Sequence, residues 1–247
     1  MSARTMTCQV TEVESLNPDV FGVTLEGRAE AMCHAPGQYL ELALDESTWV
    51  PFSIASAARG DGRLELHVQH WPERSNSARL RELLTVARQL TVRLPGGDCV
   101  LDEKSTRPLL LIAAGTGFAQ MKAIVEAALE HNPERQIDLW WAAREHRELY
   151  LEPLATRWAQ TQSQFRFHAV TELPLEEPLA EGARIAHHPG RIDEALANAT
   201  LSPKECDIYL SGSPGMVYSC LDILIEKGIE PTRVFSDVFA YAPRDKA

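Results

Sequence analysis

The sequence predicts two domains, an antiparallel β-barrel followed by an α/β domain with a doubly wound parallel sheet. In the first hundred residues, short segments alternate apolar and polar side chains between Gly, Pro and Asp turns, as antiparallel strands do. Beyond residue 106, uninterrupted apolar runs alternate with helical patterns, which is typical of parallel strands buried on both faces. The charged connector 102–108 separates the two patterns. We therefore expect a β-barrel domain at 1–103 and a separate α/β domain at 106–247.

The first domain is expected to contain six strands and one helix. The strands cover residues 7–16, 19–27, 37–44, 50–56, 63–71 and 89–96. The helix covers residues 77–84, where Leu80, Leu83 and Leu84 share one face and Ser77 has the side chain of an N-cap.

The second domain is expected to alternate strands and helices. The strands cover 107–117, 136–144, 165–172 and 206–215, and the helices cover 119–131, part of 148–160, and 216–228. Residues 171–203 carry no pattern that assigns them, and 233–241 close the chain.

The composition is that of a soluble globular protein. Of the 247 residues, 45% are apolar and 24% are charged. The formal net charge of −11 disfavours nucleic acid as a partner, because such binding needs a surplus of Lys and Arg. The first residues lack the apolar core of a signal peptide, and no apolar run approaches the about 18 residues of a membrane span. We expect a cytoplasmic protein with no membrane partner.

The cysteine and histidine patterns predict no metal. The five cysteines, Cys8, Cys33, Cys99, Cys206 and Cys220, are widely spaced and form no C-x-x-C motif. Zinc sites, Fe–S clusters and disulfide frameworks need closer or paired thiols, so we expect buried thiols in a reducing compartment. The eight histidines form no ligand constellation.

Two glycine motifs are candidates for nucleotide binding. Gly115, Thr116 and Gly117 end a buried strand and precede a helix, whose free N–H groups suit a phosphate. Gly212, Ser213, Pro214 and Gly215 occupy the same position after a later strand. Each motif alone is equally compatible with a tight turn, and the two together favour a dinucleotide site in one crevice. No G-x-S-x-G motif indicates a hydrolase.

Arg144 follows the next expected strand. Its guanidinium suits a ribose or adenosine phosphate, and a solvated surface arginine explains the position equally well. Arg144 and Arg147 together would favour NADPH, although the choice between NADH and NADPH stays open.

Six segments in order carry a resemblance to a known family. They are "PGQYLEL", "VPFSIAS", "LLIAAGTGFA", "RELY", "YLSGSPGMV" and "FSDVFAY". With them the chain resembles the ferredoxin-NADP reductase superfamily, and within it the bacterial NAD(P)H:flavin oxidoreductases. The resemblance covers nearly all of the sequence.

The resemblance implies an enzyme with a flavin (FAD, FMN or riboflavin) and NADH or NADPH. It places the flavin between the two domains, with Phe52 by the ring and Ser53 near N5, in a segment that includes Pro51 and Ile54. It assigns the nicotinamide dinucleotide to the loop with Thr116, and Phe239 and Tyr241 to the flavin region. It makes Ser53 and Thr116 the catalytic residues.

Three departures from the family pattern affect the expected function. Val50 stands where relatives carry an Arg that holds the flavin's phosphate or ribityl side. The stretch Arg74–Ser77 lacks the glycine that admits an FAD pyrophosphate, and Ser211 replaces a frequent Cys. The first two predict weak flavin binding, because a lost charge-assisted contact costs roughly 1.5–3 kcal/mol.

Three functions remain open on this basis. The first is a flavin reductase that treats flavin as a substrate. The second is an electron-transfer subunit that retains FAD or FMN and serves a separate ferredoxin or oxygenase. The third is a non-catalytic nucleotide-binding module, which the absence of the family Arg at position 50 suggests.

Overall fold

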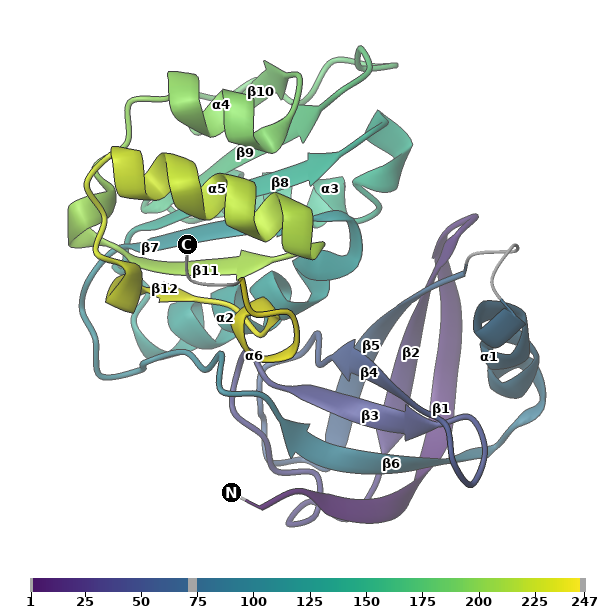
Figure 1. Ribbon diagram of the computed structural model, residues 1–247. Coiled ribbons are helices and arrows are strands. Elements are labelled where there is room, and N and C mark those ends of the chain that lie inside the picture. Colours follow the sequence, from purple (N-terminus) through teal and green to yellow (C-terminus); the bar gives the residue numbers. More distant parts are fainter. Residues whose placement is uncertain (1, 71–74, 245–247) are drawn as a thin grey trace. The chain divides into compact units, whose positions relative to one another are not determined.

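The computed structural model describes residues 2–70 and 75–244, and these form two compact units. The first unit comprises the chain up to Leu101 together with Lys122–Ala127, and the second comprises Asp102–Met121 together with the chain from Ala128 onward. Figure 1 shows the elements of both units.

The first unit is an antiparallel barrel. Its strands are β1 (Arg4–Asn17), β2 (Val20–Glu26), β3 (Tyr39–Ala43), β4 (Trp49–Ser53), β5 (Arg63–Gln69) and β6 (Gln89–Gly96). They pair in the order β4-β3-β6-β1-β2-β5. An antiparallel bridge between Ile54 and Leu66 joins the end of β4 to β5, so the sheet closes on itself.

The core of the barrel follows from strand alternation. Leu40 and Leu42 of β3 are fully buried, whereas Tyr39, Glu41 and Ala43, which alternate with them on the other face of the strand, are half-buried. The helix α1 (Ser75–Val86) adds Leu80 and Leu84 to the same core. This helix begins at Ser75, so the prediction that Ser77 is its N-cap was wrong, although the predicted helix is confirmed.

The second unit is a parallel sheet with helices on both faces. Its strands are β7 (Leu109–Ala114), β8 (Ile137–Ala143), β9 (Phe165–Thr171), β10 (Ile185–Pro189), β11 (Asp207–Ser211) and β12 (Val234–Phe235). Its helices are α3 (Glu152–Thr161), α4 (Ile192–Asn198), α5 (Pro214–Glu226), α6 (Val238–Tyr241) and the two ends of α2 (Phe118–His131), whose middle residues Lys122–Ala127 belong to the first unit. Short 3-10 turns are η1 (Gly115–Gly117), η2 (His146–Glu148), η3 (Pro203–Glu205) and η4 (Pro231–Arg233).

The strand order of this sheet is β10-β9-β8-β7-β11-β12, and every pairing is parallel. The chain starts in the middle with β7, builds outward through β8, β9 and β10, and then returns to build β11 and β12 on the other side (Figure 1). The point where the direction reverses lies between β7 and β11. The predicted doubly wound fold is confirmed, and strand reversal is the place where such sheets bind ligands.

Residues 171–203, which the sequence left unassigned, contain β10 and α4. β10 is an edge strand, and its residues are half-buried or exposed rather than fully buried. Its polar His187 and His188 hide the apolar pattern that marks the inner strands.

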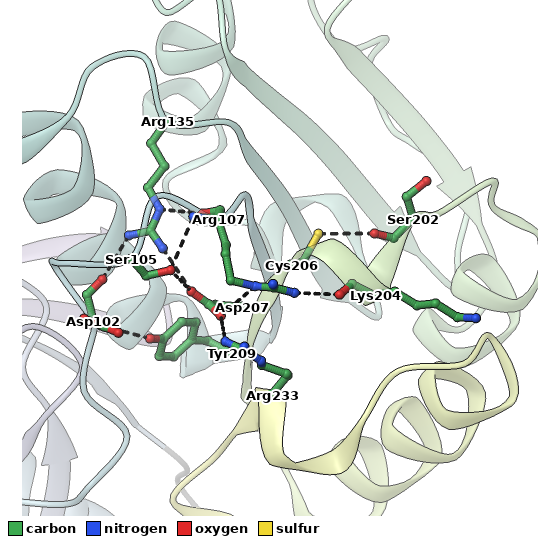
Figure 2. Close-up of polar contacts among 10 residues, drawn as sticks. All are labelled: Asp102, Ser105, Arg107, Arg135, Ser202, Lys204, Cys206, Asp207, Tyr209 and Arg233. Atoms are coloured by element: carbon green, nitrogen blue, oxygen red, sulfur yellow. Dashed lines mark hydrogen bonds and ion pairs between the residues drawn. The ribbon is translucent and has the colours of Figure 1, made fainter.

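The connector 102–108 is fastened to the second unit at the amino ends of the strands (Figure 2). Arg135 donates to the carbonyl oxygens of Arg107 at 2.8 Å and Asp102 at 3.3 Å. The hydroxyl of Tyr209 on β11 accepts from the backbone N–H of Asp102 at 3.2 Å. The unit boundary therefore falls immediately before these contacts, at Leu101.

The thiols are only partly as expected. None of the five forms a disulfide; Cys8, Cys99 and Cys220 are buried as predicted, whereas Cys206 is only half-buried. Cys33 is exposed, so the prediction of burial was wrong for it, because it lies in the loop between β2 and β3 outside the barrel core.

A cluster of stacked rings on the parallel sheet predicts a loss of stability in acid. Trp140 of β8 and His168 of β9 are register partners, and their rings stack with 4.1 Å between centroids. The ring of His188 on β10 stacks on both, with centroid distances of 4.6 Å to Trp140 and 5.2 Å to His168. Burial first, then the neighbouring His188 and Arg166, lowers the pKa of His168 to about 4.

Because the pKa of His168 is lower in the folded state than its ordinary value of about 6.5, the unfolded chain binds the proton first as the pH falls. We expect His168 to remove stability between pH 6.5 and 4, at up to about 1.4 kcal/mol per pH unit. Urea denaturation of the wild type and a His168→Phe variant across this range measures the difference in slope. Equal slopes would contradict the assignment.

Candidate functional site: glycine loops at the strand reversal and the end of β4

The two glycine motifs lie side by side in the second unit. They follow β7 and β11, which are adjacent parallel strands, so both loops leave the same edge of the sheet at the strand reversal. A Cβ placed on Gly117 would lie 2.2 Å from the carbonyl oxygen of Ser211. Only glycine therefore allows the first loop to approach the end of β11 this closely.

Two aromatic side chains, Trp141 and Phe118, support the first loop. The indole Nε1 of Trp141 on β8 donates to the carbonyl oxygen of Gly115 at 3.0 Å. The ring of Phe118 stacks on Trp141 with 3.8 Å between centroids and an interplanar angle of 9°. Gly115 itself has φ +54°, and nothing lies within 4 Å of the place where a Cβ would be, so this residue is open on its outer side.

The second loop starts helix α5. Ser213 is the N-cap, and its hydroxyl accepts from the backbone N–H of Met216 at 3.3 Å. Pro214 occupies the first turn, where its missing N–H costs no hydrogen bond. Gly215 is exposed, and no atom lies within 4 Å of a Cβ built on it, so the space beside this helix end is open.

Thr116 and Arg144 lie at the same edge of the sheet. Thr116 is half-buried in η1, and no residue in the described part of the chain bonds its hydroxyl. Arg144 is exposed directly after β8, and its backbone N–H donates to Glu148 at 2.8 Å. Arg147 instead pairs with Glu145 at 2.8 Å.

The C-terminal aromatics differ from each other. Phe239 of α6 is half-buried against the core of the second unit, and its ring centroid lies 5.8 Å from that of Tyr218. Tyr241 is 65% exposed. The structure thus brings Phe239 into a packed position and leaves Tyr241 at the surface.

In the first unit, β4 carries the predicted flavin segment. Val50 and Phe52 pair with Leu42 and Leu40 of β3 and pack against the barrel core. The alternate positions, Pro51 and Ser53, project to the other face of the strand. Ser53 is half-buried, and none of the described residues hydrogen-bonds its hydroxyl, so this group is available to a ligand.

Sequence reasoning missed the residues that the barrel places beside Ser53. Tyr39 of β3 is its direct register partner, and the Tyr39 ring lies over Gly96, where a Cβ would be 2.5 Å from the ring. The motif containing Tyr39 was recognised, but the register that brings Tyr39 to Ser53 comes from strand pairing, which the sequence does not reveal.

The stretch Arg74–Ser77 cannot be placed in the same detail. Arg74 lies outside the described residues, and the side chains of Ser75–Ser77 are likewise undescribed, although their backbone forms the first turn of α1. The inference drawn from the missing glycine stays a prediction.

Two family models match the chain in this order. Residues 7–100 match the oxidoreductase FAD-binding domain, and residues 111–222 match the oxidoreductase NAD-binding domain. The chain is therefore an oxidoreductase with a flavin-binding and a nicotinamide-nucleotide-binding domain.

Individual relatives agree with this class. The chain is 28% identical over 243 residues to an NAD(P)H-flavin reductase of Vibrio harveyi, covering 96% of this chain and 99% of the relative. It is 32% identical over 208 residues to reductase component 1 of a terephthalate 1,2-dioxygenase from Comamonas, covering 84% of this chain. It spans only 60% of the length of that relative.

Solved structures show the same fold. A cytochrome P450 reductase of Amycolatopsis superposes with a TM-score of 0.80 at 26% identity, covering 95% of this chain and 69% of the other. A ferredoxin NADP+ reductase of Neisseria gonorrhoeae superposes with a TM-score of 0.72 at 20% identity, covering 91% and 92%.

The chain carries these two oxidoreductase domains and has the fold of a ferredoxin NADP+ reductase, and along nearly its whole length it is similar to NAD(P)H-flavin reductases. This confirms the predictions of family, fold class, oxidoreductase class, and flavin and nicotinamide cofactors. The individual site residues stay predictions. Within the part of the chain that the structure describes, no helix combines the length and apolar character needed to cross a bilayer.

Proposed function

We propose that the protein is an NAD(P)H:flavin oxidoreductase that binds its flavin weakly and releases it after reduction. The observation that carries this proposal is the apolar character of β4 at position 50. Val50 packs toward the barrel core, so this position supplies no charge for the phosphate of FMN or FAD. The similarity in length and sequence to NAD(P)H-flavin reductases supports the same function.

The residues present fit such a reaction. A bound flavin supplies the acceptor for a hydride from C4 of the nicotinamide, so the protein needs no general base for this step. Ser53 offers a free hydroxyl to hydrogen-bond the flavin at N5. Thr116 and the two glycine loops hold and orient the nicotinamide nucleotide, because hydride transfer requires the reacting atoms within about 3–3.5 Å.

Steady-state oxidation of NADH and NADPH with riboflavin, FMN or FAD tests the proposal. Flavin content after desalting is measured first. We expect a protein that retains little flavin and oxidises NAD(P)H only when flavin is added. Absence of oxidation with all three flavins would refute the function and leave a non-catalytic nucleotide-binding module.

A second candidate function is an electron-transfer subunit that retains its flavin and reduces a separate acceptor protein. The 32% identity to a dioxygenase reductase component favours it. Stoichiometric flavin that survives desalting would support this candidate and exclude the release of flavin as a product.

Position 50 gives a direct prediction. Val50→Arg is expected to tighten binding of FMN and FAD about tenfold, since one charge-assisted hydrogen bond is worth roughly 1.5–3 kcal/mol. Position 50 is half-buried, so the longer side chain can lay its stem along the core and extend its guanidinium to solvent.

Equilibrium titration of flavin fluorescence measures these affinities. Riboflavin, which has no phosphate, is the internal control and should gain little. If the affinities for all three flavins stay unchanged while the variant remains folded, position 50 does not face the flavin tail.

A further inference from the structure

A buried lysine lies directly behind the segment that follows β4. Lys122 of α2 belongs to the first unit and is 7% exposed. Its ammonium donates to the carbonyl oxygen of Ala55 at 3.1 Å, to Oε2 of Glu65 at 2.7 Å, and to Oε1 of Glu126 at 2.9 Å. An ammonium has three N–H donors, so this arrangement provides one acceptor for each of them.

The two carboxylates make further contacts. Oε1 of Glu65 lies 2.8 Å from Nε2 of His67, and Oε2 of Glu126 accepts from the backbone N–H of Ala57 at 3.3 Å. Burial raises the pKa of Glu65, but the hydrogen bond from His67 and the charge of Lys122 outweigh it and lower the pKa to about 2. Glu65 is therefore ionised at neutral pH, and its Oε2 lies 2.7 Å from Nζ of Lys122.

Several hydrogen bonds hold the segment Ile54–Ala57 in place. The backbone N–H of Ile54 donates to Gln38 at 3.0 Å, and that of Ala55 donates to the carbonyl of Glu65 at 2.7 Å. The hydroxyl of Ser56 accepts from the backbone N–H of Glu65 at 3.1 Å. With the contacts of Lys122 and Glu126, both of which come from α2, this segment is fixed immediately after Ser53.

We propose that Lys122 is a positioning residue for flavin, which acts through Ala55 and Glu65 to hold the end of β4 and thereby the hydroxyl of Ser53. This inference rests on the proposed function, because it assigns Ser53 to the flavin. A misplacement of about 1 Å at a reacting group is enough to reduce catalysis strongly. Lys122 donates to three acceptors at once, and these charge-assisted hydrogen bonds limit movement of the segment that follows Ser53.

Lys122→Met tests the role, because it keeps the apolar stem and removes the charge and its three donors. The carbonyl of Ala55 then loses its donor, and Glu65 and Glu126 lose the cation between them. We expect the KM for flavin to rise about tenfold, the equivalent of one hydrogen bond to a charged group, while the KM for NAD(P)H stays within twofold.

The matched control is Lys227→Met. Lys227 also donates to two carbonyl oxygens, those of Ala197 at 2.9 Å and Ala199 at 3.0 Å, but it lies in the second unit on the segment after α5. We expect it to leave both KM values unchanged. Glu126→Gln is a milder variant for the case that Lys122→Met does not fold, and it should raise the flavin KM by an intermediate factor.

Three outcomes decide the inference. A rise in flavin KM without a rise in nicotinamide KM supports a positioning role. A lower melting temperature with both KM values unchanged overturns it, because the network is then structural alone. An equal rise in both KM values also overturns it, since the effect is then not specific for flavin.

Binding of flavin without turnover separates this inference from the proposed function. Quenching of riboflavin fluorescence by wild-type protein requires binding and no reaction. A wild type that neither binds nor reduces flavin refutes the proposed function. A wild type that does both, with Lys122→Met binding flavin equally well, refutes the role of Lys122 alone.

Discussion

Replacing Asp207 by asparagine is expected to lower the free energy of unfolding by about 3–5 kcal/mol. Asp207 begins β11 and is 3% exposed. Its carboxylate lies 3.3 Å from Arg135, 3.4 Å from Arg107 and 3.3 Å from Arg233, and it accepts from the hydroxyl of Ser105 (Figure 2).

The expected loss is large because the carboxylate is the shared anion of three guanidinium groups. Burial lowers the pKa of Arg135, and the charge of Asp207 opposes that effect, so the arginine depends on this neighbour. An asparagine keeps the shape but removes the carboxylate that lies 3.3 Å from Arg135, whose side chain is 2% exposed. Removing one partner of a buried pair costs far more than the pair contributes.

Asp222→Asn is the matched control. Asp222 pairs with Arg244 through two hydrogen bonds of 2.7 and 2.9 Å, but both side chains are about half exposed. An exposed pair contributes about 0–1 kcal/mol, so this variant should stay near the wild type. Urea denaturation at pH 7 measures both variants. Equal losses for Asp207→Asn and Asp222→Asn would contradict the role assigned to burial.

The second large effect is expected for Gly117→Ala. An added Cβ would meet the carbonyl oxygen of Ser211 at 2.2 Å and its carbonyl carbon at 2.7 Å, and both are backbone atoms. The first glycine loop must therefore move away from the end of β11. We expect the affinity for NAD(P)H to fall at least tenfold, with about 1–3 kcal/mol of stability lost to overpacking.

Gly215→Ala is the control for this change. Its Cβ would meet no atom within 4 Å, so the fold should tolerate it without loss of stability. Any loss of NAD(P)H affinity in this variant then reports on contact with the nucleotide itself. If Gly117→Ala binds NAD(P)H as tightly as the wild type, the loops after β7 and β11 are not the nucleotide site.

The sequence predicted the elements with strong periodicity. The observed bounds lie close to the predicted ones for three strands, β7, β8 and β11, and for two helices, α2 and α5. The sequence did not predict β10 and α4. β10 is an edge strand whose residues are half-buried or exposed, so it lacks the continuous apolar run of an inner strand.

Some residues of the candidate site could likewise be predicted from the sequence, and others could not. Glycines that precede a helix are local signals, so Gly115, Gly117, Gly212 and Gly215 were identified from their neighbours in the chain. Tyr39, opposite Ser53, and Lys122, behind Ala55, were not, because both reach their places through long-range pairing. Strand register and helix packing depend on which distant surfaces fit together, and no local pattern encodes them.

The sequence by itself determined the order of the two domains, their strand and helix content, and the missing charge at Val50. Only the tertiary structure decided that β7 and β11 are neighbours, so that two loops separated by almost a hundred residues meet at one edge. The tertiary structure also brings three arginines from distant segments, Arg107, Arg135 and Arg233, into contact with Asp207. The physical reason is that a buried carboxylate requires cations, and only the folded chain can bring them to it.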